Sequence, residues 1–99
     1  MIKEQIRELE SLTKYLKDKD KNIINDAINF SYLAHKDQLR KSGDPYIIHP
    51  IEVAKILTSI NLDASAIAAG LLHDTIEDSD ISIKEISNSF GDQISELVQ

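Results

Sequence analysis

The chain has 99 residues, enough for one small domain around a single hydrophobic core, which excludes two independent domains. Hydrophobic residues make up 41% and charged residues 28%, which is typical of a folded domain and excludes a disordered one. The formal net charge of -6 disfavours nonspecific nucleic-acid binding, so an anionic ligand needs local basic groups or a metal ion.

Cysteine usage and hydropathy limit where the protein works. There is no cysteine, which excludes disulfide bonds and thiolate zinc sites and is compatible with the cytoplasm. The first residues are charged and contain no apolar signal segment, and no stretch approaches the roughly 18 apolar residues of a membrane span. We therefore expect a cytoplasmic protein with no membrane segment and no nucleic-acid partner.

Apolar residues at helical spacing predict two amphipathic helices in the first part of the chain. The first helix covers about residues 1–16. The charged run at 17–21 favours a solvated turn, although such a run can also continue a helix. The second helix covers residues 22–39, and its two adjoining apolar stripes indicate a central place in the fold. The stripes are Ile23, Ala27, Phe30 and Ala34, and Ile24, Ile28 and Ser31.

A loop is predicted over residues 40–45, because Gly43 permits unusual backbone angles and Pro45 restricts the chain. Pro50 fits the first turn of the next helix, which continues to about Ile60 and places His49 at its start.

The second half of the sequence predicts further helices. Asp63 or Ser65 can cap a helix through residue 72, whose small residues would let a neighbouring helix approach closely. Ser82 and Glu85 have capping-box spacing before a helix that Gly91 ends, and a last apolar stripe begins after it without room for an ordinary helix. No strand-like alternation appears, so we expect an all-α bundle of about five to six helices.

The segment at residues 71–78 places an imidazole and three carboxylates after an apolar run. Buried carboxylates need neutralising partners, and a divalent cation is a natural one. If the segment is helical, His73 and Asp74 could hold a metal from adjoining stripes, with Glu77 and Asp78 one turn further to orient or deprotonate water. His49 could supply a third ligand. Mixed nitrogen and oxygen ligands favour manganese, iron or zinc over calcium, and manganese suits phosphate chemistry best.

Simpler interpretations stand beside this one. A single His-Asp pair is common by chance, His49 could only cap a helix, and Glu77 and Asp78 could be solvated charges near a helix end. Residues Arg40, Lys41 and Ser42 could grip a phosphate or a base, or form an ordinary solvent-facing loop. His35 could be a ligand, a hydrogen-bond donor to one, or a packed histidine, and we favour a structural role.

Three segments together resemble a known family. Residues 34–50 read AHKDQLRKSGDPYIIHP, residues 71–78 read LLHDTIED, and Phe90-Gly91 follows. This combination is similar to the HD-type hydrolase domain of RelA/SpoT homologues, over about residues 22–98. Members of that family that only synthesise the guanosine nucleotide (p)ppGpp lack the His-Asp pair. The resemblance therefore points to the members that hydrolyse it.

The resemblance implies an all-α HD-domain bundle that releases the 3′-pyrophosphate of the guanosine nucleotide (p)ppGpp with the help of Mn²⁺. It further implies three metal ligands, an acidic pair that activates water, and a nucleotide-binding loop. In that order these are His49, His73 and Asp74; Glu77 and Asp78; and Arg40, Lys41 and Ser42.

One departure qualifies these expectations. The family's fourth ligand is an aspartate on a later helix, beyond residue 99. We therefore expect residues 1–99 to be the N-terminal part of an HD domain, with a leading helix at 1–16, an incomplete site and an exposed face that favours self-association. Two alternatives are an inactive remnant that binds nucleotide or a partner, and an HD phosphohydrolase acting on another nucleotide.

Overall fold

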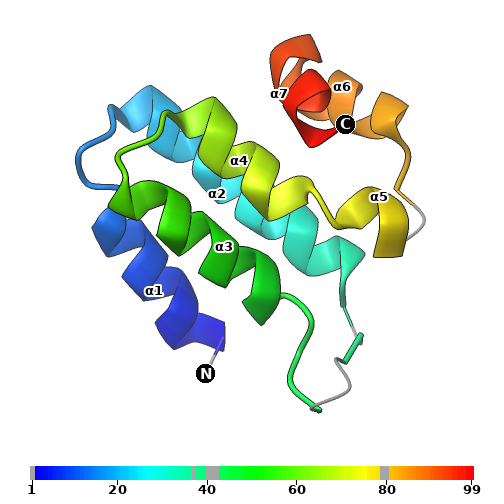
Figure 1. The fold of residues 1–99 in the computed structure, drawn as a ribbon, viewed down its shortest axis with the longest axis horizontal. Coiled ribbons are helices and arrows are strands. Elements are labelled where there is room, and N and C mark those ends of the chain that lie inside the picture. Colours follow the sequence, from blue (N-terminus) through cyan, green and yellow to red (C-terminus); the bar gives the residue numbers. More distant parts are fainter. Residues whose placement is uncertain (1, 37, 40–42, 79–80) are drawn as a thin grey trace.

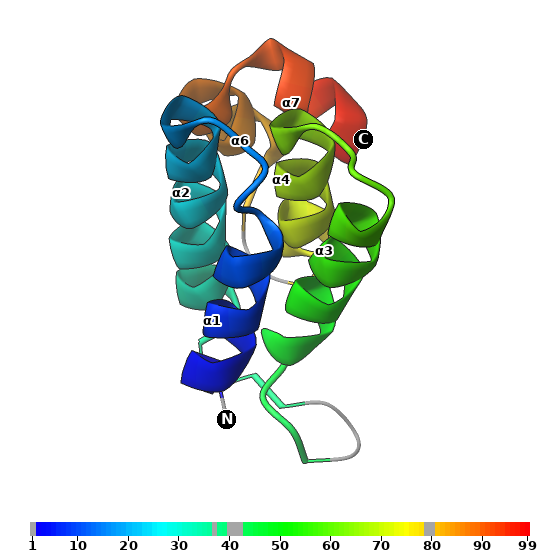
Figure 2. The same ribbon diagram turned by 90° about the vertical axis from the view of Figure 1, so that its left-hand side faces the viewer.

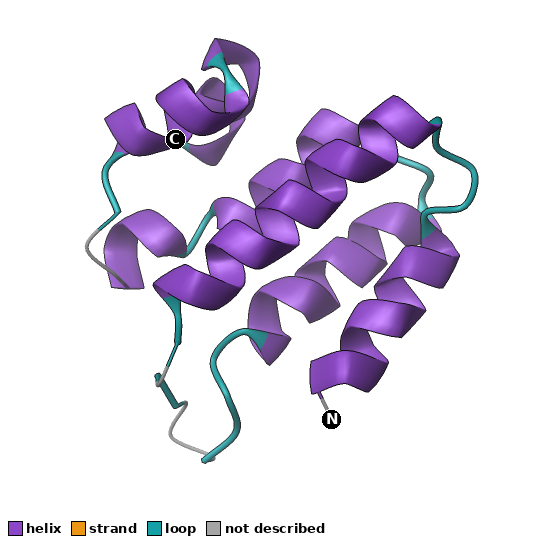
Figure 3. Cartoon of the chain, turned by 180° about the vertical axis from the view of Figure 1, so that it is seen from behind, coloured by secondary structure: helices purple, strands orange, loops and turns teal. Residues whose placement is uncertain are grey.

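The part of the chain that the structure describes consists of helices joined by loops, as Figure 3 shows. The computed structural model describes residues 2–36, 38–39, 43–78 and 81–99, without the side chains of Glu77 and Asp78. Within these residues the expected all-α architecture is confirmed, with six helices and one four-residue turn of helix, α5. The helices are α1 (Ile2–Leu12), α2 (Asp18–Ala34), α3 (Ile48–Ser59), α4 (Ala64–Leu72), α5 (Thr75–Asp78), α6 (Ile83–Phe90) and α7 (Asp92–Val98).

Helix α4 lies at the centre and contacts α2, α3 and α7. Figure 2 shows it between α2 and α3, with α1 beside α3, and Figure 1 shows α6 and α7 together at one end. Its sequence is apolar on nearly all sides, so burial against several neighbours removes most of its surface from water. The buried residues of α4 are Ala64, Ile67, Ala68, Ala69, Leu71 and Leu72.

Small residues on α4 let α3 pack closely against it, as expected from the sequence. A Cβ atom added to Gly70 would lie 2.7 Å from Cδ1 of Leu57 on α3. The missing Cβ of Gly70 therefore leaves room for the Leu57 side chain between the two helices that carry the candidate site.

Side chains fix the starts of α4 and α6. Asp63 accepts a hydrogen bond from the Ala66 backbone N–H at 3.0 Å, so Asp63, rather than Ser65, is the N-cap of α4. Ser82 accepts one from the Glu85 backbone N–H at 3.2 Å and caps α6, as its spacing predicted. Gly91, at φ +91°, ends α6.

The boundaries of the first two helices differ from the prediction. Helix α1 ends at Leu12, and the Thr13 hydroxyl donates to the Glu10 carbonyl just beyond that point. Helix α2 begins at Asp18, inside the charged run, because acidic side chains in a first turn interact favourably with the helix dipole. It ends at Ala34 rather than near residue 39.

Residues 71–78 do not form one continuous helix, so the condition under which His73 and Asp74 would lie on adjoining helical stripes is not met. Helix α4 ends at Leu72, His73 and Asp74 form a turn, and α5 begins at Thr75. Two carbonyls near this end accept side-chain hydrogen bonds, from the His73 ring at Gly70 and from the Thr75 hydroxyl at Leu72. Such bonds compete with continuation of the helix.

None of the described helices is long and apolar enough to span a membrane.

Candidate metal centre

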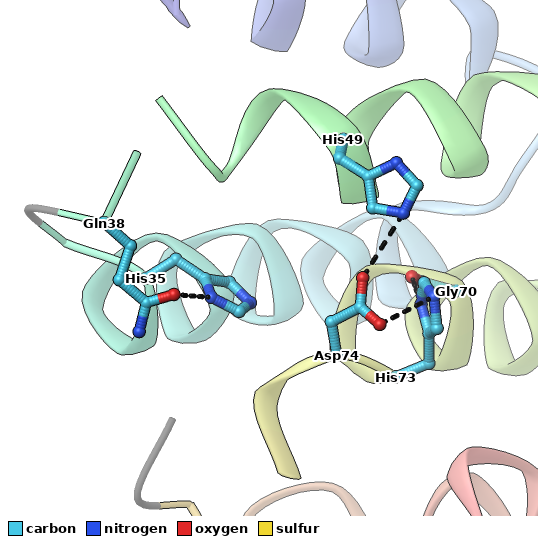
Figure 4. Close-up of polar contacts among 6 residues, drawn as sticks. All are labelled: His35, Gln38, His49, Gly70, His73 and Asp74. Atoms are coloured by element: carbon cyan, nitrogen blue, oxygen red, sulfur yellow. Dashed lines mark hydrogen bonds and ion pairs between the residues drawn. The ribbon is translucent and has the colours of Figure 1, made fainter. Parts of the chain in front are cut away.

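The structure brings His49, His73 and Asp74 together. Each offers one ligand atom, and these atoms all lie within 4.8 Å of one another. Asp74 stands between the imidazoles in Figure 4: its Oδ2 lies 3.3 Å from Nε2 of His49, and its Oδ1 lies 3.2 Å from Nε2 of His73. Residues 24 positions apart therefore share one site, formed by the first turn of α3 and the turn after α4.

Local backbone structure aims each ligand. His49 lies in the first turn of α3, as expected from the proline that follows it, and its side chain is about one third exposed. His73 is the C-cap of α4, and its ring folds back so that Nδ1 lies 2.6 Å from the Gly70 carbonyl. The break between α4 and α5 thus turns both His73 and Asp74 toward α3.

The hydrogen bond to Gly70 decides the state of the His73 ring. A carbonyl oxygen only accepts, so Nδ1 must carry a proton and donate it. In the neutral imidazole, Nε2 is then an unprotonated acceptor that faces a carboxylate oxygen 3.2 Å away. Two facing acceptors repel each other unless a proton or a cation lies between them.

Asp74 strengthens the argument for a cation. Its side chain is 13% exposed, and the buried Oδ2, although 3.3 Å from Nε2 of His49, makes no hydrogen bond with the described residues. A buried, unsatisfied carboxylate oxygen is costly, and a metal ion offers compensation. Two imidazole nitrogens and a carboxylate are also a donor set that manganese, iron and zinc accept. The residues present therefore fit a divalent metal ion.

The other predicted site residues are not placed. Arg40, Lys41 and Ser42 lie outside the described residues. The backbone of Glu77 and Asp78 belongs to α5, directly after the turn that carries His73 and Asp74, but their side chains lie outside the description. Their expected roles remain predictions.

The structure adds Tyr46 as a neighbour of the site and shows His35 as a packed histidine, the structural role favoured from the sequence. The Tyr46 ring meets the His49 ring edge-to-face, with centroids 6.2 Å apart. His35 is buried, stacks on Tyr46 and bonds to the Gln38 side chain. In the sequence, the three-residue spacing between Tyr46 and His49 was the only sign that these two side chains could meet. The loop before α3 has no periodic pattern, so the stacking of His35 on Tyr46 could not be predicted.

Comparisons with known proteins agree with this site. A family model described as an HD domain matches residues 27–99, a range that contains all three candidate ligands. The chain is 46% identical over 88 residues to a GTP pyrophosphokinase of Myxococcus xanthus, an alignment covering 89% of this chain and 12% of that protein. It is 44% identical over 91 residues to a GTP pyrophosphokinase of Brucella melitensis, covering 92% of this chain and 12% of that protein.

A third relative is named as a hydrolase. Over 73 residues the chain is 49% identical to a Synechocystis protein named "probable guanosine-3′,5′-bis(diphosphate) 3′-pyrophosphohydrolase", covering 74% of this chain and 10% of that protein. The chain thus spans about a tenth of the length of the curated relatives it matches.

Proposed function

Because this chain belongs to the HD domain family, and within it to the RelA/SpoT group, we propose that it is the metal-binding part of a (p)ppGpp 3′-pyrophosphohydrolase. The observation that carries the proposal is the convergence of His49, His73 and Asp74 from two separate segments of the chain. The name of the Synechocystis relative supports the choice of substrate.

We propose Mn²⁺ as the ion and these three residues as its ligands. His73 is prepared for this role because its Nδ1 donates to Gly70 and leaves the Nε2 lone pair free to coordinate. Asp74 contributes negative charge from a position with little access to water, where its attraction for a cation is weakly screened. A divalent ion supplies Lewis acidity, which polarises a phosphoryl oxygen and acidifies water.

We assign the remaining roles on the family resemblance. Glu77 and Asp78 would take the proton from the attacking water, and α5 starts directly after the metal-binding turn, which suits that role. Arg40, Lys41 and Ser42 would bind the nucleotide, whose phosphates need local positive charge in a chain of net charge -6. We also propose that residues 1–99 form the N-terminal part of the hydrolase domain, with α1 as a leading helix.

The test is release of pyrophosphate from (p)ppGpp in the presence of Mn²⁺ by a protein that carries residues 1–99 together with the downstream part of the hydrolase domain. We expect His73→Ala and Asp74→Ala to abolish turnover, and Glu52→Ala, which alters an exposed residue of α3, to preserve it. Undiminished turnover in the two site variants would refute the assignment. Turnover of other nucleotides but not of (p)ppGpp would indicate a different substrate. Binding of nucleotide or a partner chain without turnover would indicate an inactive module.

A further inference from the structure

The two imidazoles of the candidate site are held in different ways. The His73 ring is fixed by the hydrogen bond from its Nδ1 to the Gly70 carbonyl, at 2.6 Å. Among the described residues, the only polar contact of the His49 ring is with Asp74, through Nε2. A ligating histidine usually has its second nitrogen held by a hydrogen bond, which fixes the ring orientation. Some other contact must therefore orient His49.

Aromatic rings supply that contact. The Tyr46 ring packs edge-to-face against His49, with a centroid distance of 6.2 Å and an interplanar angle of 77°. On its own, an aromatic pair of this kind limits but does not fix the orientation of a ring that is about one third exposed. Tyr46 must itself be held firmly to orient His49, and it lies in the segment just before α3.

His35 packs against one face of the Tyr46 ring. Its ring stacks on the Tyr46 ring, with centroids 4.6 Å apart and planes 29° apart. Only 2% of His35 is exposed, so the ring cannot leave the stack without opening the end of α2. Its Nδ1 donates to Oε1 of Gln38 at 3.2 Å, which sets the ring plane, as Figure 4 shows. The backbone N–H of Tyr46 also bonds to the Gln38 carbonyl, at 3.0 Å.

We infer that His35 is a positioning residue for His49: it holds the Tyr46 ring by stacking, and Tyr46 limits the orientation of the His49 imidazole. The planar ring of His35, rather than its capacity to bind a metal, is the property that matters. The buried Nε2 of His35 has no hydrogen-bond partner among the described residues. His35 is also not one of the three clustered ligands. The significance of this arrangement for metal binding rests on the proposed function.

A pair of substitutions tests the inference. His35→Phe keeps a planar ring in the stack, whereas His35→Leu keeps an apolar side chain there but removes the ring. Ile86→Ala, in the buried core of α6, serves as a control that lowers stability without touching the rings. The first measurement is NMR of the histidine rings in the metal-free protein. We expect the His49 ring resonances to move in His35→Leu and to stay close to wild type in His35→Phe and Ile86→Ala.

The second measurement is calorimetric titration with Mn²⁺. We expect affinity to fall about tenfold or more in His35→Leu and to stay near wild type in the other two variants. Equal effects of the leucine and phenylalanine substitutions, or no effect of either on the His49 resonances, would overturn the inference. If the wild-type protein binds no Mn²⁺ while the NMR pattern appears as expected, the proposed function fails and the positioning role of His35 stands.

Discussion

Asp74 and His73 are adjacent in the chain and face each other through two atoms that normally accept hydrogen bonds, Oδ1 and Nε2, 3.2 Å apart. A neutral ring cannot place its single proton on Nε2, because Nδ1 needs that proton to donate to Gly70, so either a second proton or a cation must lie between the two atoms. With a neutral His73 ring, the pair is thus arranged to receive a cation and is less stable without one, as expected of a functional site.

This arrangement predicts that Asp74→Asn separates stability from metal binding. The amide can donate a hydrogen bond to an imidazole nitrogen, so we expect the metal-free variant to be about 0.5–1.5 kcal/mol more stable than wild type. Saturating Mn²⁺ should stabilise the wild type, by about 2.7 kcal/mol at a hundredfold excess over Kd, and leave the variant unchanged. Urea unfolding with and without Mn²⁺ measures both effects.

The matched control is Asp26→Asn, which makes the same chemical change at an exposed position of α2. It should respond to Mn²⁺ as the wild type does. A clear loss of metal-free stability in Asp74→Asn would contradict the view that the carboxylate is strained by its neighbours.

The cap of α4 gives a prediction about the central helix. Asp63→Ala removes the side chain that accepts from the Ala66 N–H, and should lower the free energy of unfolding by about 1 kcal/mol. Asp63→Asn keeps an acceptor oxygen and should cost much less. Urea unfolding compares the two, and equal losses would show that the charge matters and the cap does not.

The sequence predicted the parts of this fold that local rules govern. The apolar stripes of α2, the Ser82 cap and the position of His49 at a helix start were all found from spacing and residue type. The start of α2 was wrong because a charged run without apolar anchors is compatible with both a turn and a first helical turn.

The convergence of the site could be inferred from the family resemblance but not from periodicity. The turn at His73 and Asp74 depends on side-chain hydrogen bonds to the Gly70 and Leu72 carbonyls, which no hydrophobic pattern reports. The stacking of His35 on Tyr46 is likewise a tertiary contact, made across a loop whose path the sequence does not specify.

From the surroundings of Tyr15 we predict how the free energy of unfolding responds to alkaline pH. Its hydroxyl donates to the Leu62 carbonyl at 2.7 Å, and its pKa is raised above 10.0 by burial and then by the negative charge of Asp63. The folded state therefore keeps the proton more firmly than the unfolded state does. The resulting contribution of Tyr15 to the free energy of unfolding is complete below pH 10.0. It is lost as pH rises through the higher pKa of Tyr15 in the folded protein.

We expect Tyr15→Phe to lower the free energy of unfolding by roughly 0.5 kcal/mol at neutral pH, at the low end for a hydrogen bond because the side chain is 46% exposed. Above pH 10.0 the difference between wild type and variant should shrink. Urea unfolding over a pH series measures it. A difference that grows with pH would show that the sign of the linkage is wrong.

Lys55 on α3 contacts the leading helix α1. From these contacts we predict that local unfolding begins with the detachment of α1. Its Nζ donates to the Gln5 side chain and to Oε2 of Glu8, two residues on α1, from a side chain that is only 19% exposed. Lys55→Met keeps most of the apolar stem and removes both contacts. Because Glu8 is largely exposed, its contribution is small, and we expect a total loss of about 1 kcal/mol.

That loss should be confined to α1, which packs on α3 and makes no contact of comparable extent with α4. Hydrogen exchange should therefore quicken about fivefold for the α1 amides in Lys55→Met while the α4 amides keep their wild-type rates. Lys84→Met, at an exposed position of α6, should change neither helix. Equal acceleration in α1 and α4 would mean that the leading helix unfolds only with the whole domain, and that Lys55 stabilises the bundle rather than the attachment of α1.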